Sequence, residues 1–278
     1  MRDIYEGARA ARELSVMTSI TGAAPVLAPI LGGVLQVAFG WRSVFIAMTL
    51  IGVTLFLCAA LLLPETIRQK QTAPLSVRGV LRSFAVVGRN PAFRAYVGIQ
   101  AMGYTGLFCF ISTSSFVLQR LYGFSPLAFS LAFALCSASF LSGTFLNRRL
   151  VPRYGINGTI GIGVVCLSLG GLLQLACVAL FPQSSLAFIA PITIFFLGIG
   201  LILPLSIAGA LAPFPERAGA ASSLMGLCQM GLAAIVGALV IRLLDESAVP
   251  LAIAMAVSGL MALAIFQTSK QARRDPAR

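Results

Sequence analysis

Apolar residues along this chain come in eight long blocks separated by short polar gaps. A helix needs about 20 apolar residues to cross the hydrocarbon core of a bilayer, and each block is near that length. The first block follows a basic start, as a signal peptide would, but it is too long for a signal sequence and another block follows at once. The pattern therefore predicts eight membrane-spanning helices, over residues 15–38, 43–63, 93–118, 126–146, 157–181, 185–211, 217–242 and 248–266.

The longest gap, residues 64–92, separates two predicted helices from the six that follow. Within it, the stretch PLSVRGVLRSFAVVGRN has apolar residues at helical spacing, with Arg78, Arg82 and Arg89 between them. This pattern predicts a short amphipathic helix lying on the inner leaflet. A solvated basic linker is the alternative.

Composition supports the membrane interpretation. The chain has 278 residues, of which 58% are hydrophobic and only 10% are charged. A soluble domain carries about 25% charged residues, so this chain has too few to cover a surface that faces water. The fold class predicted from the residues is an all-α polytopic membrane protein with about eight transmembrane helices.

The net charge of +12 would suggest nucleic-acid binding in a soluble protein. Here the basic residues lie in the short gaps instead. If the N-terminus is placed in the cytoplasm, only Arg42, Arg120 and Arg242 fall on the opposite side, and the other 17 of the 20 Lys and Arg residues are cytoplasmic. This asymmetry predicts that both termini are cytoplasmic, with the lipid bilayer and not nucleic acid as partner.

The gap at 147–155 reads NRRLVPRYG, and we expect a tight cytoplasmic turn that joins two spans. Arg148 and Arg149 can anchor the helix end at the lipid headgroups, and Arg153 adds a third basic side chain. A role in gating and a role in topology alone are both open.

Histidine, which is the commonest general base and the commonest metal ligand, is missing. The six cysteines of the chain lie inside apolar blocks without a C-x-x-C motif, as small buried hydrophobic residues do. We therefore expect no enzyme, no catalytic residue, no metal and no cofactor. All eight acidic residues lie in loops, tails or helix ends, so the chain offers no mid-membrane carboxylate to carry a proton.

A polar stripe runs along the predicted helix 93–118. Gln100, Tyr104, Phe108 and Ser112 recur at helical spacing and share one face. Lipid offers no hydrogen bonds, so such a face is expected to contact protein or a water-filled cavity. We interpret it as cavity lining, with hydrogen bonding between helices as the alternative. The mid-span amides Gln174 and Gln229 are candidates for the same cavity.

The first block contains residues that normally interrupt helices, in the stretch TGAAPVLAPILGGVL. Its prolines and glycines cluster toward one helix face, where small residues let another backbone approach closely and proline sets a bend. We expect this face to form a close helix contact, with an ordinary kinked helix as the alternative. Its residues are Gly22, Pro25, Pro29, Gly32 and Gly33.

Four stretches together resemble the major facilitator superfamily and, within it, the Bcr/CflA drug:proton antiporters. They are RDIYEGARAARELS, the stretch above that resembles the antiporter motif G-P-x-x-G-P-x-x-G-G, FISTSSFVLQRLYGFSPLAFSLAFAL with LNRRLVPRYG, and LAPFPERAGAASSLMGLCQMG. Alanine replaces both leading glycines of the antiporter motif, and Leu205 and Cys136 stand where the family often has asparagine.

The resemblance implies a fold, a function and a location. By alignment the eight helices resemble the fifth to twelfth of a twelve-helix fold. The implied organisation is a remnant of the N-terminal bundle over 1–63, a central cytoplasmic basic loop over 64–92, a complete C-terminal six-helix bundle over 93–266 and a basic tail over 267–278. The implied protein is a monomer of the bacterial inner membrane that exports small amphipathic drugs by alternating access, driven by protons. The face of Pro25, Pro29, Gly32 and Gly33 would then lie where the two bundles meet.

Two alternatives stay open. The chain can be a transport-inactive fragment of such a transporter, or it can be a membrane scaffold that acts with another helix bundle. Translation of the DNA upstream of Met1 distinguishes the fragment from a longer transporter.

Overall fold

The computed structural model describes residues 27–62, 77–244 and 247–269. Of the antiporter-like face, Gly22 and Pro25 lie outside the described residues, as do the stretch RDIYEGARAARELS and most of the C-terminal tail. Every regular element in the described ranges is helical, which confirms the predicted all-α fold. Six of these helices are long and apolar enough to cross a membrane.

The chain divides into two compact units, formed by residues 1–74 with 125–134 and by residues 75–124 with 135–278. In the first unit, helix Leu27–Phe39 ends at Gly40, whose positive φ of 80° lets the chain turn directly into α2, Trp41–Leu62. The Ser43 hydroxyl donates to the Leu35 and Gly40 carbonyls, which fixes this turn. The turn falls between the predicted spans 15–38 and 43–63, and the described part of the first, Leu27–Phe39, is by itself shorter than a spanning helix.

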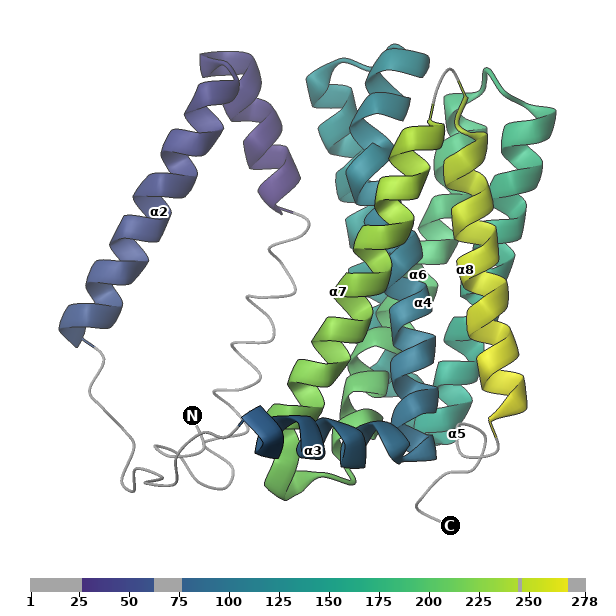
Figure 1. Cartoon of the computed structure of the whole chain (residues 1–278). Coiled ribbons are helices and arrows are strands. Elements are labelled where there is room, and N and C mark those ends of the chain that lie inside the picture. The colour runs from purple at the N-terminus through teal and green to yellow at the C-terminus, as the bar shows by residue number, and fades with distance from the viewer. Residues whose placement is uncertain (1–26, 63–76, 245–246, 270–278) are drawn as a thin grey trace. The chain divides into compact units, whose positions relative to one another are not determined.

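The second unit is a bundle built around α4, Pro91–Ser115, which packs against α6, α7 and α8. The remaining elements are the π-helical turn η1 (Phe116–Leu121), α5 (Pro126–Leu180), α6 (Ser185–Leu211), η2 (Pro215–Arg217), α7 (Ala218–Leu243) and α8 (Val249–Thr268). The largest fully buried side chains come mainly from α4 and α6, and include Phe110, Phe188 and Phe195. Figure 1 shows α4 behind α7 and α8.

Two predicted spans, 126–146 and 157–181, are joined in α5. A straight helix of its 55 residues would be about 80 Å long, far more than the bilayer core of about 30 Å. The chain bends at Gly155, whose φ of 71° and ψ of 176° are not helical. Gly143 in the first half of α5 packs against Gly200 of α6, and Gly163 in the second half packs against Gly198, so both halves of α5 contact α6.

The expected turn over 147–155 is therefore wrong in extent. Residues 147–154 continue the helix, and Gly155 alone makes the turn. One glycine suffices because it reaches a positive φ without the steric cost that a side chain imposes. Arg148, Arg149 and Arg153 are exposed on this helical end, and the Arg148 and Arg153 guanidinium groups lie over the rings of Phe145 and Tyr154.

The predicted amphipathic helix is present as α3, Val77–Arg89. Asn90 ends it and caps α4, because its side-chain oxygen accepts from the backbone N–H groups of Ala92 and Phe93. α3 lies across the ends of the spanning helices (Figure 1). That orientation suits a helix at a membrane interface better than a free linker.

Candidate functional site

The candidate site begins with a hydrogen bond between α4 and α7. The Gln100 amide donates from Nε2 to Gln229 Oε1 at 2.6 Å. Gln100 is 2% exposed and its own Oε1 has no hydrogen-bond partner among the described residues, whereas Gln229 is half-exposed. The two glutamines thus form one polar unit that reaches from the bundle interior to its surface.

Two aromatic rings continue the face of α4 above Gln100. Tyr104 and Phe108 stack with ring centroids 6.3 Å apart and an interplanar angle of 24°. The Phe108 ring fits against α7 because Gly237 has no side chain: a Cβ there would lie 3.1 Å from the ring. Both aromatic residues are half-exposed, so they present flat apolar walls beside the amide pair.

Three glycines of α7 have no close neighbour from another described helix. A Cβ added at Gly219, Gly226 or Gly231 would meet no atom within 4 Å. Small residues on a membrane helix either admit a neighbouring helix closely or leave room for a ligand. We call the four residues Gln100, Tyr104, Phe108 and Gln229 the amide–aromatic face. Gln100 is buried, and the other three are half-exposed.

Two predicted residues lie apart from this face. Ser112 is exposed one turn further along α4. Gln174, on the second half of α5, is 0% exposed, and neither its Oε1 nor its Nε2 has a partner among the described residues. Such an amide is costly to bury, so its presence needs an explanation.

The antiporter-like face of helix Leu27–Phe39 is described at Pro29, Gly32 and Gly33. Gly33 is buried, and a Cβ there would lie 2.8 Å from the Cβ of Ser130 at the start of α5, within the same compact unit. Gly32 borders open space among the described residues. Sequence reasoning treated the two glycines alike, because it had no means to identify Ser130 as a neighbour.

A second polar contact, which the sequence did not single out, joins the first half of α5 to α6. Pro204 has no N–H, so the carbonyl of Gly200 lacks its usual partner four residues on. Thr144 Oγ1 and Asn147 Nδ2 each donate to that carbonyl at 3.3 Å. Contact this close requires Gly143 and Gly200, where a Cβ would meet the backbone of the other helix. Pro204 and Asn147 can each be seen in the sequence. The sequence does not show that Asn147 donates to the carbonyl that Pro204 leaves without a partner.

A third buried contact lies near the other end of α4. The Tyr96 hydroxyl donates to Asn157 Oδ1 at 2.7 Å, and the Tyr96 ring rests on Gly209, where a Cβ would lie 2.8 Å from it. This contact ties α4, α5 and α6 together beside the Gly155 turn. The amide–aromatic face is thus carried by a bundle whose helices are fixed by polar contacts.

The arrangement can bind a ligand but offers no reaction chemistry. The described residues contain no group of three or more His, Cys, Asp or Glu side chains that could hold a metal ion. Glu216, the one acidic residue in the described ranges, is exposed in η2 at a helix end. Among the described residues, the site is a small amide and aromatic face on a bundle of membrane-length helices.

The comparisons identify the family. The model of the Major Facilitator Superfamily matches residues 1–238, and the chain belongs to that superfamily. The members of this superfamily are membrane transporters and not enzymes. Membership in a family of membrane proteins agrees with the six helices that are long and apolar enough to cross a bilayer.

Individual relatives carry more specific names. The chain is 28% identical over 275 residues to the uncharacterized MFS-type transporter YdgK of Bacillus subtilis, with 98% of this chain and 68% of that protein covered. It is 26% identical to the bicyclomycin resistance protein homolog of Haemophilus influenzae, with coverage of 92% and 64%. It is 27% identical to multidrug resistance protein D of Escherichia coli, with coverage of 81% and 56%. The chain thus spans about three fifths of the length of these relatives.

Proposed function

We propose that the chain is the larger part of a drug:proton antiporter that exports small amphipathic compounds across a bacterial inner membrane. The observation that carries the proposal is the amide–aromatic face. Its half-exposed glutamine and stacked rings suit a ligand that has both a hydrogen-bonding group and a flat apolar body. The names of the relatives, which refer to bicyclomycin and multidrug resistance, support a substrate of this kind.

We propose that transport occurs by alternating access. In such transporters, two bundles rock about a site near the middle of the membrane and expose it to each side in turn. Gly33 supports a close helix contact at the antiporter-like motif, because it lies against Ser130 of α5 within the same compact unit, with no room for a side chain. The proton-coupling group is not among the membrane-spanning residues of this chain, since all its acidic residues lie in loops, tails or helix ends.

Dye efflux tests the proposal. Drug-sensitive bacteria expressing the chain, or the chain extended by any in-frame sequence upstream of Met1, are loaded with a cationic dye. We expect efflux that stops when a protonophore collapses the proton gradient. Efflux that persists with the protonophore would contradict proton coupling. Absence of efflux from both versions, with normal membrane insertion, would instead favour the inactive fragment or the scaffold.

Variants at the glutamine pair test the site itself. Gln100→Leu, Gln229→Leu and the double variant remove the interhelical hydrogen bond, and Gln183→Leu in the exposed turn before α6 is the control. If the pair binds substrate, the double variant stays folded and loses efflux at least tenfold. If the pair only joins two helices, removing both partners is nearly neutral and efflux is retained.

A further inference from the structure

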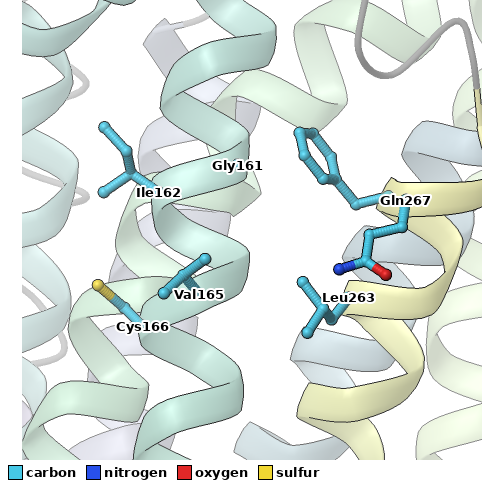
Figure 2. A pocket seen from close by; sticks show the side chains of 7 residues that line it. Gly161, Ile162, Val165, Cys166, Leu263 and Gln267 are labelled. Atoms are coloured by element: carbon cyan, nitrogen blue, oxygen red, sulfur yellow. The ribbon is translucent and has the colours of Figure 1, made fainter.

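A groove on the outer surface of the second unit lies apart from the proposed transport site. It runs between the second half of α5 and the end of α8 and encloses a cavity of about 460 Å³. Figure 2 shows Leu263 and Gln267 of α8 across the groove from Val165 of α5. Gly161, Cys166 and Phe266 complete the walls, which are apolar except at Gln267.

The groove exists because the two helices separate toward this end. Further along, their backbones touch: a Cβ at Gly171 or Gly259 would lie 2.9 Å from a backbone atom of the other helix, and Ser168 donates to the Gly259 carbonyl at 2.8 Å. At Gly161 the neighbour is the ring of Phe266 and no longer a backbone. The bulk of that ring holds the helices apart and leaves the hollow beside it.

The groove opens outward and not into the bundle. Val165 is 56% exposed, and Gln267 is exposed at the rim. Both helices are long and apolar enough to cross a membrane. An outward-facing apolar groove at membrane depth is filled by lipid tails, because neither water nor an unpaired polar group is stable there.

One exposed basic side chain lies toward the end of the groove that carries Gln267. Arg153 is exposed at the Gly155 turn, where the second half of α5 begins. The sequence continues beyond α8 with Lys270, Arg273 and Arg274. The distribution of basic residues assigns this end to the cytoplasm, where basic side chains between spanning helices attract anionic lipid headgroups.

We propose that this groove binds an anionic phospholipid of the cytoplasmic leaflet. One acyl chain lies between Val165 and Leu263, and the headgroup phosphate accepts hydrogen bonds from the Gln267 amide and the Arg153 guanidinium. The site does not depend on the proposed transport function, because its lining shares no residue with the amide–aromatic face.

Native mass spectrometry of the purified full chain tests the proposal. Phosphatidylglycerol and phosphatidylcholine with identical acyl chains are added in turn, and the bound lipids are counted. We expect each protein to retain one more lipid molecule with phosphatidylglycerol than with phosphatidylcholine. Val165→Phe fills the groove and should remove that lipid, whereas Leu172→Phe, two turns along the same exposed face of α5, should not.

Charge variants and one measurement on the native chain complete the test. Arg153→Gln should lower the preference for phosphatidylglycerol at least threefold, while Arg120→Gln, at the other end of the membrane, leaves it unchanged. In nanodiscs, phosphatidylglycerol should slow the reaction of Cys166 with N-ethylmaleimide relative to phosphatidylcholine. Equal occupancy by the two lipids, or equal Cys166 reactivity in both, would overturn the proposal even if a variant fails to fold.

Discussion

At the residue scale, two neighbouring glycines of helix Leu27–Phe39 have different surroundings. Gly33 has Ser130 where its side chain would be, whereas Gly32 has open space among the described residues. Two glutamines differ in the same way. The Gln100 amide donates a hydrogen bond to Gln229, whereas the buried Gln174 amide has no partner among the described residues. In each pair the residue types are identical, and only the neighbours distinguish their roles.

Gly33→Ala should therefore abolish dye efflux, and Gly32→Ala should leave it intact. The alanine at position 33 would place its Cβ 2.8 Å from that of Ser130, closer than real atoms approach. Ser130→Gly, combined with Gly33→Ala, should restore efflux by removing the obstructing side chain. Equal efflux in the two alanine variants would show that this close contact has no role in transport.

Gln174→Met should raise the free energy of unfolding by about 1–3 kcal/mol, because it removes an unpaired buried amide and nearly conserves volume. Thermal unfolding in detergent measures the change. Gln119→Met is the control and should not gain stability, because the wild-type Gln119 amide already donates to the Ser115 hydroxyl at 2.7 Å. Efflux lost despite the gain in stability would support the predicted cavity role of Gln174. Efflux retained would remove it from the cavity.

At the element scale, proline and glycine in α6 act through the neighbouring helix. Pro204 leaves the Gly200 carbonyl without a donor, and α5 supplies Thr144 and Asn147 in its place. The glycines at 143 and 200 make that approach possible. The interruption in α6 is thus compensated by side chains of another element, as expected for proline in a membrane helix.

Asn147→Leu should destabilise the protein by about 1–3 kcal/mol, since it leaves the buried carbonyl with Thr144 alone. In a protein that also carries Pro204→Ala, Asn147→Leu should cost less stability, because the alanine N–H can donate to the Gly200 carbonyl within α6. A double-mutant cycle on the thermal unfolding midpoint measures this coupling. Strictly additive effects would show that Asn147 does not compensate for the proline.

At the scale of the whole molecule, the distribution of basic residues predicts one orientation of the helices in the membrane. The turn at Gly155 and the helical end with Arg148, Arg149 and Arg153 lie on the side assigned to the cytoplasm, and the short turn between α5 and α6 lies on the other. The interfacial helix α3 and the proposed lipid groove both require this orientation.

Reporter fusions check the orientation directly. Green fluorescent protein joined after Arg278 should fluoresce, because the C-terminus is predicted to be cytoplasmic. Alkaline phosphatase joined after Gln183 should be active, because that turn is predicted to face outward. The reverse pattern would invert the topology and place the proposed groove in the outer leaflet.

The sequence by itself determined the fold class, the position of nearly every span and the family. These properties follow from block length, charge asymmetry and local motifs, which act over a few turns of one helix. It also predicted α3, because amphipathic spacing is local. Among the candidate site residues, it brought together Gln100, Tyr104 and Phe108, which share one face of a single helix.

The tertiary structure decided which helices meet, and therefore what each residue contacts. It paired Gln100 with Gln229 and Gly33 with Ser130, and it left Gln174 without a partner. It also showed that Gly155 alone turns α5, and that α5 and α8 separate to form a groove. None of these contacts follows from the pattern of one segment, because each depends on the register and crossing of two helices that the chain brings together from a distance.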